Sequence, residues 1–414
     1  MREMKDSGIA WVTTIPQNWD TIANKYIMRK IKHINPVYNG EDILSLTVNG
    51  VIVRDLDAGG KMPTSFDGYQ FLYPGNLLMC LFDYDVTPRC IGLIKNNGIT
   101  SPAYSQFVMK DGYSAEYYYY YYLMVDHTKA ILHLAKNLRH SFTEDQLGMI
   151  SVPVPPLQEQ YSIAAFLDEK CSEIDKTATD IQKQIEVLEQ YKRSMITKLV
   201  TKGEKTDSEK RDSGVQWIGQ MPSHWEVIRG KYILQYMQKP VRENDGVITC
   251  FRDGEVTLRS NRREDGFTMS DKEIGYQGID VGDLVVHGMD GFAGAIGISD
   301  SRGKASPVLN VLDTKQNKRY IMYYLRSMAY SDVFLALATG IRVRSCDLRW
   351  NKLAELLYPV PPLEEQEAIV KRIDEVIVKT DKVIAEKKAQ LDTLEEYKKS
   401  LIFEYVTGKK EVPA

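Results

Sequence analysis

The sequence predicts an α+β protein built as an internal repeat, with two α+β domains and two long helices. The motif Val-Pro-Val-Pro-Pro-Leu-Gln-Glu-Gln at 152–160 recurs as Tyr-Pro-Val-Pro-Pro-Leu-Glu-Glu-Gln at 358–366. The two copies are 358 − 152 = 206 residues apart in a chain of 414 residues. Each copy opens a charged segment with heptad spacing. Short β-branched runs cut by Gly, Asn and Asp fill the stretches before them, as expected of strands. The repeat divides the chain into 1–151, 152–205, 206–357 and 358–414.

A short segment containing tryptophan and proline begins each copy. Asp6-Ser-Gly-Ile-Ala-Trp11 with Pro16-x-x-Trp19 returns as Asp212-Ser-Gly-Val-Gln-Trp217 with Pro222-x-x-Trp225, again 212 − 6 = 206 residues apart. We expect Trp19 and Trp225 to anchor these leading segments on their domains. The polar stretch 201–211 between the copies is typical of a linker.

The domains between the repeated words, about 20–151 and 226–357, hardly resemble each other in sequence. Their apolar runs predict strands within 43–53, 77–82, 284–287 and 295–298. The aromatic segments 117–122 and 320–325, and the stretches 129–138 and 329–338, predict helices. A run of six tyrosines could stack on bases, but at helical spacing half of the rings face the core. We therefore expect packing.

The repeated prolines predict the start of each long helix, because proline at the first helical position loses no hydrogen bond. Glu159, Glu364 and Glu365 then place negative charge in the first turn. Each helix would run about 45 residues, roughly 65 Å. The apolar seam predicts helix–helix pairing as a coiled coil, with a helix packed on its own domain as the alternative. The seam comprises Leu167, Ile174, Ile181, Leu188 and Met195, then Ile373, Ile377, Ile384, Leu391, Leu394 and Leu401.

The composition narrows the class of protein. A net charge of −3 requires any anionic partner to be met by local patches rather than by a global field. The five cysteines are odd in number and form no Cys-x-x-Cys, which favours reduced thiols in the cytoplasm over a disulfide framework or a zinc site. The N-terminus lacks the apolar core of a signal peptide, and no apolar run reaches the length of a membrane span. We expect a cytoplasmic protein with no membrane partner.

With these motifs in place, the sequence resembles the specificity subunit of a type I restriction-modification system. The likeness rests on Pro-Val-Pro-Pro-Leu-x-Glu-Gln before each long helix and Glu-x-Tyr-Lys-[Lys/Arg]-Ser near its end. Ser-Gly-x-x-Trp-x-x-x-x-Pro-x-x-Trp at the start of each copy and the 206-residue spacing complete it. Inside the two domains only Pro74-Gly75-Asn76-Leu77-Leu78, answered by Val281-Gly-Asp-Leu-Val285, and two Ser-Pro pairs correspond.

The resemblance implies an antiparallel coiled coil with a target-recognition domain at each end, related by a pseudo-two-fold axis. Each domain would read one half of a bipartite, asymmetric site in double-stranded DNA, and the coiled coil would set the unread gap. Two methyltransferase subunits and, through the complex, a motor-nuclease subunit are the implied partners. They would supply adenine-N6 methylation, translocation and cleavage, and would carry the S-adenosylmethionine, ATP and Mg²⁺. This chain would hold no cofactor and no metal.

Arginine forks bind phosphates and read guanine, and amide forks read adenine, so arginine clusters and polar loops are the candidate DNA contacts. A solvated surface with nearby acidic partners is the alternative for the arginines. In the second domain the candidates are Arg252, Arg259, Arg262, Arg263, Arg342, Arg344 and Arg349. In the first domain they are sparser and comprise Arg54, Lys61, Arg89, Lys95, Asn97 and Tyr104.

The sequence offers no catalytic constellation for this chain. Asn35-Pro36-Val37-Tyr38 lacks the second proline of the adenine-methyltransferase tetrapeptide, and the glycine loop at 292–297 lies in the other copy. No Gly-x-x-x-x-Gly-Lys-[Ser/Thr] is present, so we expect no P-loop. Two alternatives remain open. One is a coiled-coil scaffold whose domains bind proteins, and the other is a self-contained modification enzyme.

Overall fold

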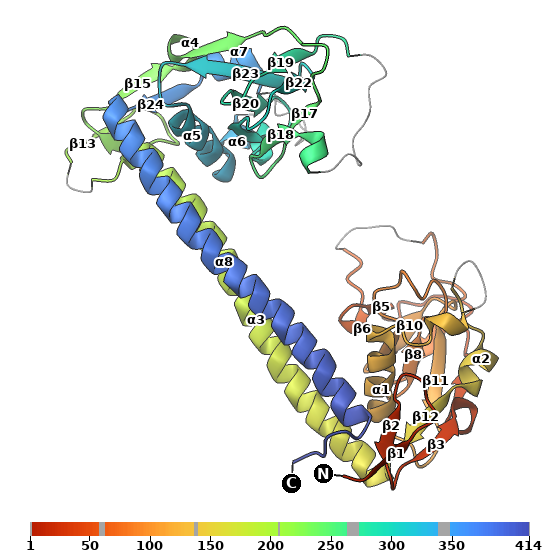
Figure 1. Cartoon of the computed structure of the whole chain (residues 1–414). Helices are drawn as coiled ribbons and strands as arrows, with labels where there is room; N and C mark the ends of the chain where they lie inside the picture. The colour runs from red at the N-terminus through yellow and green to blue at the C-terminus, as the bar shows by residue number, and fades with distance from the viewer. Residues whose placement is uncertain are drawn as a thin grey trace. The chain divides into compact units, whose positions relative to one another are not determined.

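The computed structural model describes residues 2–57, 63–135, 140–205, 208–262, 273–337 and 348–413 (Figure 1). They form two compact units. Unit 1 comprises Met1–Ile181 with Lys388–Ala414, and unit 2 comprises Gln182–Lys387. The long helices α3 (Leu157–Lys202) and α8 (Leu363–Val406) each contribute to both units. Each unit therefore contains the start of one long helix and the end of the other, so a repeat and a unit are different divisions of the chain.

Two short antiparallel ribbons organise the leading segment of each unit. In unit 1, β1 (Met4–Asp6) pairs with β2 (Thr14–Pro16), and β3 (Asp20–Ala23) pairs with β12 (Ser151–Val154). In unit 2, the corresponding pairs are β13 (Lys210–Asp212) with β14 (Gln220–Pro222) and β15 (Glu226–Arg229) with β24 (Leu357–Val360). β12 and β24 include the first Pro-Val of the repeated motif, and two prolines separate each of these strands from the long helix that follows.

The variable domains share one topology despite their different sequences. Each has a four-stranded antiparallel sheet, in the order β4-β11-β8-β9 in unit 1 and β16-β23-β20-β21 in unit 2. The strands of the first sheet are β4 (Met28–Ile31), β8 (Leu77–Met79), β9 (Ile91–Leu93) and β11 (Ser105–Met109). Those of the second are β16 (Leu234–Met237), β20 (Leu284–His287), β21 (Ile296–Ile298) and β23 (Leu309–Thr314).

Two further strand pairs also occur in both units. The pair β7 (Gln70–Leu72) with β10 (Gly98–Thr100) corresponds to β19 (Gln277–Ile279) with β22 (Gly303–Ala305). The hairpin β5 (Leu44–Thr47)–β6 (Gly50–Val53) corresponds to β17 (Ile248–Cys250)–β18 (Val256–Leu258). Residues 43–53, expected to be a strand, are thus a hairpin, because Val48 and Asn49 form the turn and Gly50, with a φ of 95°, begins the second strand.

One aromatic helix packs behind each sheet, as the sequence predicted. α1 (Ala115–His127) starts at the N-cap Ser114, and α5 (Lys318–Tyr330) starts at the N-cap Asn317. Five of the six consecutive tyrosines in α1 are buried, so the packing interpretation is confirmed. The shorter helices are α2 (Glu144–Met149), α4 (Gly230–Ile233), α6 (Val333–Ala336), α7 (Trp350–Glu355) and the 3-10 turns at Asn24–Tyr26, Leu132–Leu134, Arg259–Asn261 and Gly291–Ala293.

Two expectations about helices need correction. The stretch 129–138 was expected to be helical, but its described part holds only the 3-10 turn Leu132–Leu134, because Lys129 has a φ of 48° just after α1. The long helices begin one residue after the proline. The Pro156 and Pro362 carbonyls accept the first helical hydrogen bonds, which makes these prolines N-caps and Leu157 and Leu363 the first helical residues.

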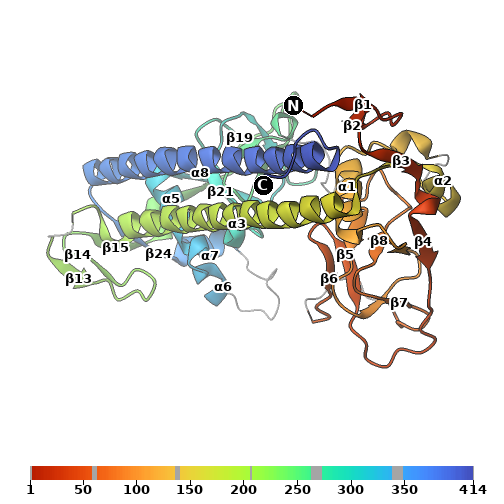
Figure 2. The ribbon, with the colours of Figure 1, turned by 90° about the horizontal axis from the view of Figure 1, so that it is seen from below.

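Within each unit the segments of α3 and α8 lie side by side (Figures 1 and 2). In unit 1 the ring of Phe166 lies 4.5 Å from that of Tyr405, and Asp175 pairs with Lys398. In unit 2, Lys192 pairs with Asp381. In unit 1 the partner numbers fall along α8 as they rise along α3, so the segments run in opposite directions there. Of the expected seam, Leu167, Ile174, Ile373, Ile384 and Leu401 are buried, whereas Ile181, Leu188, Met195, Ile377, Leu391 and Leu394 are half-buried.

The first turns of each long helix belong to the core of their own domain. Leu167 and Ile174 pack in one cluster with the tyrosines of α1 and with Leu401. Ile369 and Ile373 pack in the other with the tyrosines of α5 and with Ile196. Near the domains, both interpretations of the apolar stripe therefore hold, because it contacts the domain and the neighbouring helix. No helix in the described part of the chain is long and apolar enough to span a membrane.

Candidate nucleic-acid interface

A buried glutamine fastens the aromatic helix of each unit to the start of a long helix. Gln160, fully buried, accepts a hydrogen bond at Oε1 from the Ser114 N–H at 2.9 Å and donates from Nε2 to the Pro155 carbonyl at 2.8 Å. Gln366 makes the same two bonds, with the Asn317 N–H and the Pro361 carbonyl. These are the last residues of the two repeated Pro-Pro-Leu-x-Glu-Gln words. The glutamine therefore fixes the angle at which a domain meets its helix.

Two tyrosines of each aromatic helix complete the fastening. Tyr117 donates to the Val406 carbonyl at 2.8 Å, and its counterpart Tyr320 donates to the Val200 carbonyl at 3.0 Å, which satisfies the free C-terminal end of the other long helix. One turn later Tyr120 donates to Asp168 at 2.6 Å, and Tyr323 donates to Asp374 at 2.8 Å. Burial, followed by the Asp374 bond, raises the pKa of Tyr323 to about 12, which keeps its hydroxyl a donor.

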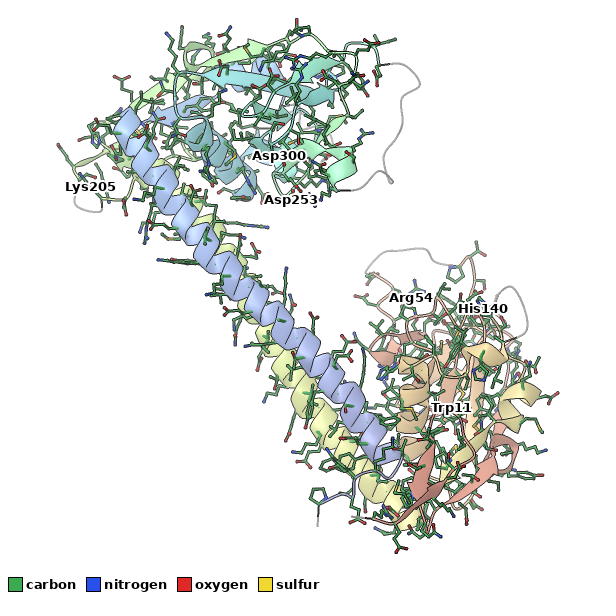
Figure 3. All side chains as sticks on the ribbon, viewed as in Figure 1. Trp11, Arg54, His140, Lys205, Asp253 and Asp300 are labelled. Carbon is green, nitrogen blue, oxygen red and sulfur yellow. The ribbon has the colours of Figure 1, made fainter. Side chains whose placement is uncertain are left out.

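The tryptophans anchor the leading segments, as expected. Trp19 and Trp225 are 0% and 1% exposed. Gly408 and Gly203, which follow α8 and α3 with φ of 69° and 71°, let the chain pass directly over these indoles. Trp11 (Figure 3) donates to the Tyr121 hydroxyl, and Trp217 donates to that of Tyr324. We call the set of Gln160, Tyr117, Tyr120 and Trp19, with its counterpart Gln366, Tyr320, Tyr323 and Trp225, the mount.

Each unit also has a groove beside its aromatic helix and its hairpin, lined by α3 in unit 2 and by both α3 and α8 in unit 1. In unit 2 the groove measures about 620 Å³ and is lined by Lys192, Arg193, Arg252, Arg326 and Tyr330, with three acidic side chains. Arg193 and Arg326 lie 5.4 and 5.7 Å from the Tyr330 ring centroid. The unit 1 groove measures about 950 Å³ and includes Val48, Arg89, Lys398 and Lys399. Among these residues the sequence prediction named Arg252 and Arg89 as candidate DNA contacts and missed the others, although Lys192 and Lys398 belong to the repeated motif near the end of each long helix.

The structure places the predicted arginines of unit 2 around one hairpin. Arg252 lies in its turn, beside Asp253 (Figure 3), and its 67% exposed side chain contacts Asp290. Arg259 donates from Nε to Thr249 Oγ1 at 3.0 Å across the hairpin. Arg262 lies 4.1 Å from the Phe251 ring centroid and pairs with Asp253 and Glu255. Arg349 is exposed at the N-cap of α7, whereas Arg263, Arg342 and Arg344 lie outside the described residues.

The candidates of unit 1 are less concentrated. Arg89 is bound to the Ile91 and Val48 carbonyls and to the Tyr119 hydroxyl, so it joins the hairpin to α1. Arg54 (Figure 3) follows β6 and is half-buried, and Lys95 and Asn97 are exposed between β9 and β10. Tyr104 is half-buried against Phe82. Lys61 lies outside the described residues. Arg89 is thus held structurally, while Lys95 and Asn97 face solvent.

A network of two cations and three carboxylates stabilises the second domain. Lys239 contacts Asp280 and Asp283, and Arg302 contacts Asp245 and Asp280, at 2.5 to 2.8 Å. Hydrogen bonds from Lys239 and then Arg302 lower the pKa of Asp280 to about 2. No group of three histidine, cysteine or acidic side chains in the described ranges is placed to hold a metal ion.

Comparison with known proteins agrees with the motifs. A family model described as the type I restriction modification DNA specificity domain matches residues 91–187. Two curated relatives from Methanocaldococcus jannaschii match. The MjaX type I restriction enzyme specificity subunit is 28% identical over 281 residues, which is 65% of this chain and 61% of the relative. The MjaVIII type I restriction enzyme specificity subunit is 27% identical over 277 residues, covering 63% and 62%. The chain thus spans about three fifths of each relative's length.

Two solved structures share the fold along the whole chain. A chain from a study of complex assembly and conformational transition of the type I R-M system has a TM-score of 0.68 at 12% identity, over 96% of this chain and 99% of that one. The HsdS subunit from Thermoanaerobacter tengcongensis has a TM-score of 0.50 at 13% identity, over 96% and 98%. The family model and both relatives confirm the resemblance to type I restriction-modification specificity subunits, and the solved structures agree with the mixed α+β fold containing long helices.

Proposed function

We propose that this chain, as a type I specificity subunit that recognises DNA, reads a bipartite and asymmetric site, with one half-site per variable domain. One observation carries this proposal. The two units hold the same topology on the same mount, yet the side chains around their hairpins differ completely. A shared frame with unlike surfaces suits two readers that must be positioned alike but must recognise different base pairs.

The contacts we propose are those predicted from the sequence, now ordered by how exposed their side chains are. In unit 2, Arg252 and Arg349 are exposed and Arg252 pairs with Asp290, whereas Arg262 is held by both Asp253 and Glu255. In unit 1, Lys95 and Asn97 are the exposed pair. Arginine and asparagine recognise guanine and adenine edges by paired hydrogen bonds, and lysine binds phosphates.

The long helices would act as the spacer between the two readers. The heptad seam and the opposed ion pairs Asp175–Lys398 and Lys192–Asp381 support an antiparallel coiled coil over α3 and α8. In this proposal 1–151 and 206–357 contain the readers, and 152–205 and 358–414 form the ruler. Inserting one heptad into each helix should lengthen the unread gap and leave both half-sites unchanged. An unchanged gap would refute the ruler.

The chemistry would belong to partners. We propose that two methyltransferase subunits, and through them a motor-nuclease subunit, assemble on this non-catalytic chain and carry the S-adenosylmethionine, ATP and Mg²⁺. Methylation-sensitive long-read sequencing of DNA modified by the reconstituted complex would report both half-sites, the gap and the modified adenines. Uniform or absent methylation by an active complex would contradict the proposal.

Salt dependence separates a DNA reader from a scaffold that binds only proteins. Each phosphate neutralised by a cation contributes about −0.9 to the slope of log K against log salt. We expect a clearly negative slope for the complex on duplex DNA, measured by fluorescence anisotropy. Arg252→Ala should weaken binding through the second half-site only. Arg319→Ala is the matched control, because Arg319 is similarly exposed but pairs with Asp374 at the mount. A flat slope would favour the scaffold.

A further inference from the structure

Two cysteines face each other where the central strands of the first variable sheet end. β8 and β9 pair with Met79 opposite Ile91, so the same register places Cys80 opposite Cys90. The Cys80 N–H donates to the Cys90 carbonyl at 2.9 Å, which continues the ladder by one residue. Directly opposite residues of antiparallel strands have Cα atoms about 4.5 to 5.5 Å apart and side chains on the same face. Disulfides need a Cα separation of roughly 4.4–6.8 Å, so this register suits a disulfide.

The two thiols also contact each other, and a cation lies beside them. Cys80 and Cys90 are 2% and 3% exposed, and their side chains hydrogen-bond each other. The bond from Cys90 lowers the pKa of Cys80, because it stabilises the thiolate. Lys129, which also pairs with Asp126, places its Nζ 3.6 Å from Cys90 Sγ. Because its side chain is 25% exposed, Lys129 connects the buried pair with solvent.

The corresponding position of unit 2 holds other residues. There Val286 pairs with Ile296, and the His287 N–H then donates to the Ala295 carbonyl at 3.0 Å, as Cys80 does to Cys90. The two sheets therefore continue their ladders in the same way, but only the sheet of unit 1 places two thiols at this point. Any chemistry of the pair would act on one variable domain and leave the other unchanged.

We propose that Cys80 and Cys90 form a redox modification site, at which hydrogen peroxide converts the two thiols into a reversible disulfide. A thiolate attacks one peroxide oxygen, the O–O bond breaks, and the products are a sulfenic acid and a hydroxide that takes up a proton. The second thiol then attacks the sulfenic sulfur, the S–S bond forms, and the hydroxyl leaves with the thiol proton as water. Two thiols and one peroxide thus give one disulfide and two waters.

Reversal needs a dithiol reductant, which reduces the bond by thiol–disulfide exchange. In a reducing compartment such a disulfide is transient, as redox-sensing disulfides are. The bond closes the loop 80–90, whose residue Arg89 joins the hairpin to α1 through the Val48 carbonyl and the Tyr119 hydroxyl. Closing a loop of this length slows local opening by up to about a hundredfold. Oxidation therefore rigidifies the first variable domain.

Peptide mapping of the full chain tests the disulfide, because trypsin cleaves after Arg89 and so between the two cysteines. The purified chain is treated with hydrogen peroxide, its remaining thiols are alkylated in urea, and it is digested without reductant. We expect the peptides 62–89 and 90–95 to remain joined and to separate after dithiothreitol. Separate, alkylated peptides after peroxide treatment, or oxidation that dithiothreitol does not reverse, would overturn the proposal.

Matched variants and hydrogen exchange complete the test. Cys80→Ser should lose the joined peptide, whereas Cys250→Ser, which changes a similarly buried cysteine of unit 2, should keep it. In the oxidised wild type, exchange should slow by up to about a hundredfold in β8 and β9 and stay unchanged in β20 and β21, the matching strands of unit 2. Equal slowing in both sheets, or slowing in the Cys80→Ser chain, would also overturn the site.

Discussion

Unit 1 and unit 2 are alike where they meet the long helices and unlike where they face outward. Both fasten an aromatic helix with a buried glutamine and two tyrosine hydroxyls. Around its hairpin, unit 2 has an arginine cluster and a network of ion pairs. Unit 1 has the exposed Lys95 and Asn97, and its Arg89 is bound to the Val48 carbonyl of the hairpin. The comparison teaches that the mount and the surface around the hairpin can vary independently. Small differences within the mount allow this conclusion to be tested.

The largest expected effect comes from the glutamines. Gln160→Ala removes two buried hydrogen bonds and leaves the Ser114 N–H without its partner, for a loss of about 2–4 kcal/mol. Gln366→Ala should cost somewhat more, because its Nε2 also donates to Gln316 at 2.7 Å. Native-state hydrogen exchange in α1 and α5 reports the two units separately. Exposed Gln158→Ala is the control, and equal loss in both helices from either variant would contradict separate mounts.

The second-largest effect is expected from replacing the glycines that follow the long helices, and its size should differ between the two units. A Cβ at Gly408 would lie 2.5 Å from Pro16 Cγ and 2.9 Å from Trp19 Cη2, whereas one at Gly203 would lie 3.1 Å from Trp225 Cζ2. We expect Gly408→Ala to destabilise unit 1 by about 2–4 kcal/mol and Gly203→Ala to destabilise unit 2 by about 1–2 kcal/mol. Gly214→Ala isolates the backbone cost, because its φ is 70° with nothing within 4 Å. The reverse order in hydrogen exchange would disprove the steric argument.

The costs of replacing the two tryptophans should differ by the energy of one hydrogen bond. Trp19 Nε1 donates to Glu159 at 2.9 Å, whereas Trp225 Nε1 is buried with no hydrogen-bond partner among the described residues and Glu365 bonds His224 instead. Trp19→Phe should therefore lower the free energy of unfolding by about 1–3 kcal/mol more than Trp225→Phe does, because a hydrogen bond to a carboxylate is lost only in unit 1. Urea-dependent exchange in each unit measures the difference. Equal losses would show that packing alone sets the anchor.

The smallest expected effect is that acid weakens the sheet beside Asp280 in unit 2 more than the matching sheet of unit 1. The pKa of Asp280 is lowered from 3.8 to about 2, so its contribution to stability is present above pH 4 and is lost as the pH falls from about 4 to 2. Asp280→Asn should remove this dependence at every pH. Exchange in β19 and β22 between pH 5 and 2.5 provides the measurement, with β7 and β10 of unit 1 as the internal reference. Identical acid profiles in the two sheets would count against the network.

The mount was largely predictable because the sequence repeats it. Trp19, Trp225 and the six tyrosines were expected to pack, and they are mostly buried. The sequence shows only that Gln160 and Gln366 occupy the same position in the two repeats. It does not indicate which backbone groups their side-chain amides bond. The shared strand order of the variable domains was not predictable either, because strands of three to six residues with different side chains carry almost no common pattern.

The proposed DNA-contact surface was the least predictable part. Arg262 and Arg89 have the residue type that binds DNA, but Phe251 with two carboxylates, and the Val48 carbonyl with Tyr119, already hold them. These partners lie 7 to 41 positions away in the sequence, so no local sequence pattern predicts them. The opposite holds for the ion pairs Asp175–Lys398 and Lys192–Asp381, where the repeat places each residue 206 positions from its counterpart and one pair implies the other.

The way unit 1 is completed has a consequence for biosynthesis. Unit 2 is one continuous stretch of chain, but unit 1 needs α8, as in the Tyr117–Val406 bond between residues 289 positions apart. The ribosome synthesises the chain from its N-terminus. Unit 1 therefore cannot complete its fold until the end of α8 has been made, whereas unit 2 can fold as soon as residue 387 has emerged. Until then the part of Trp19 and Pro16 that Gly408 covers is exposed on the nascent chain. Prematurely ended products would expose this apolar face to chaperones and proteases.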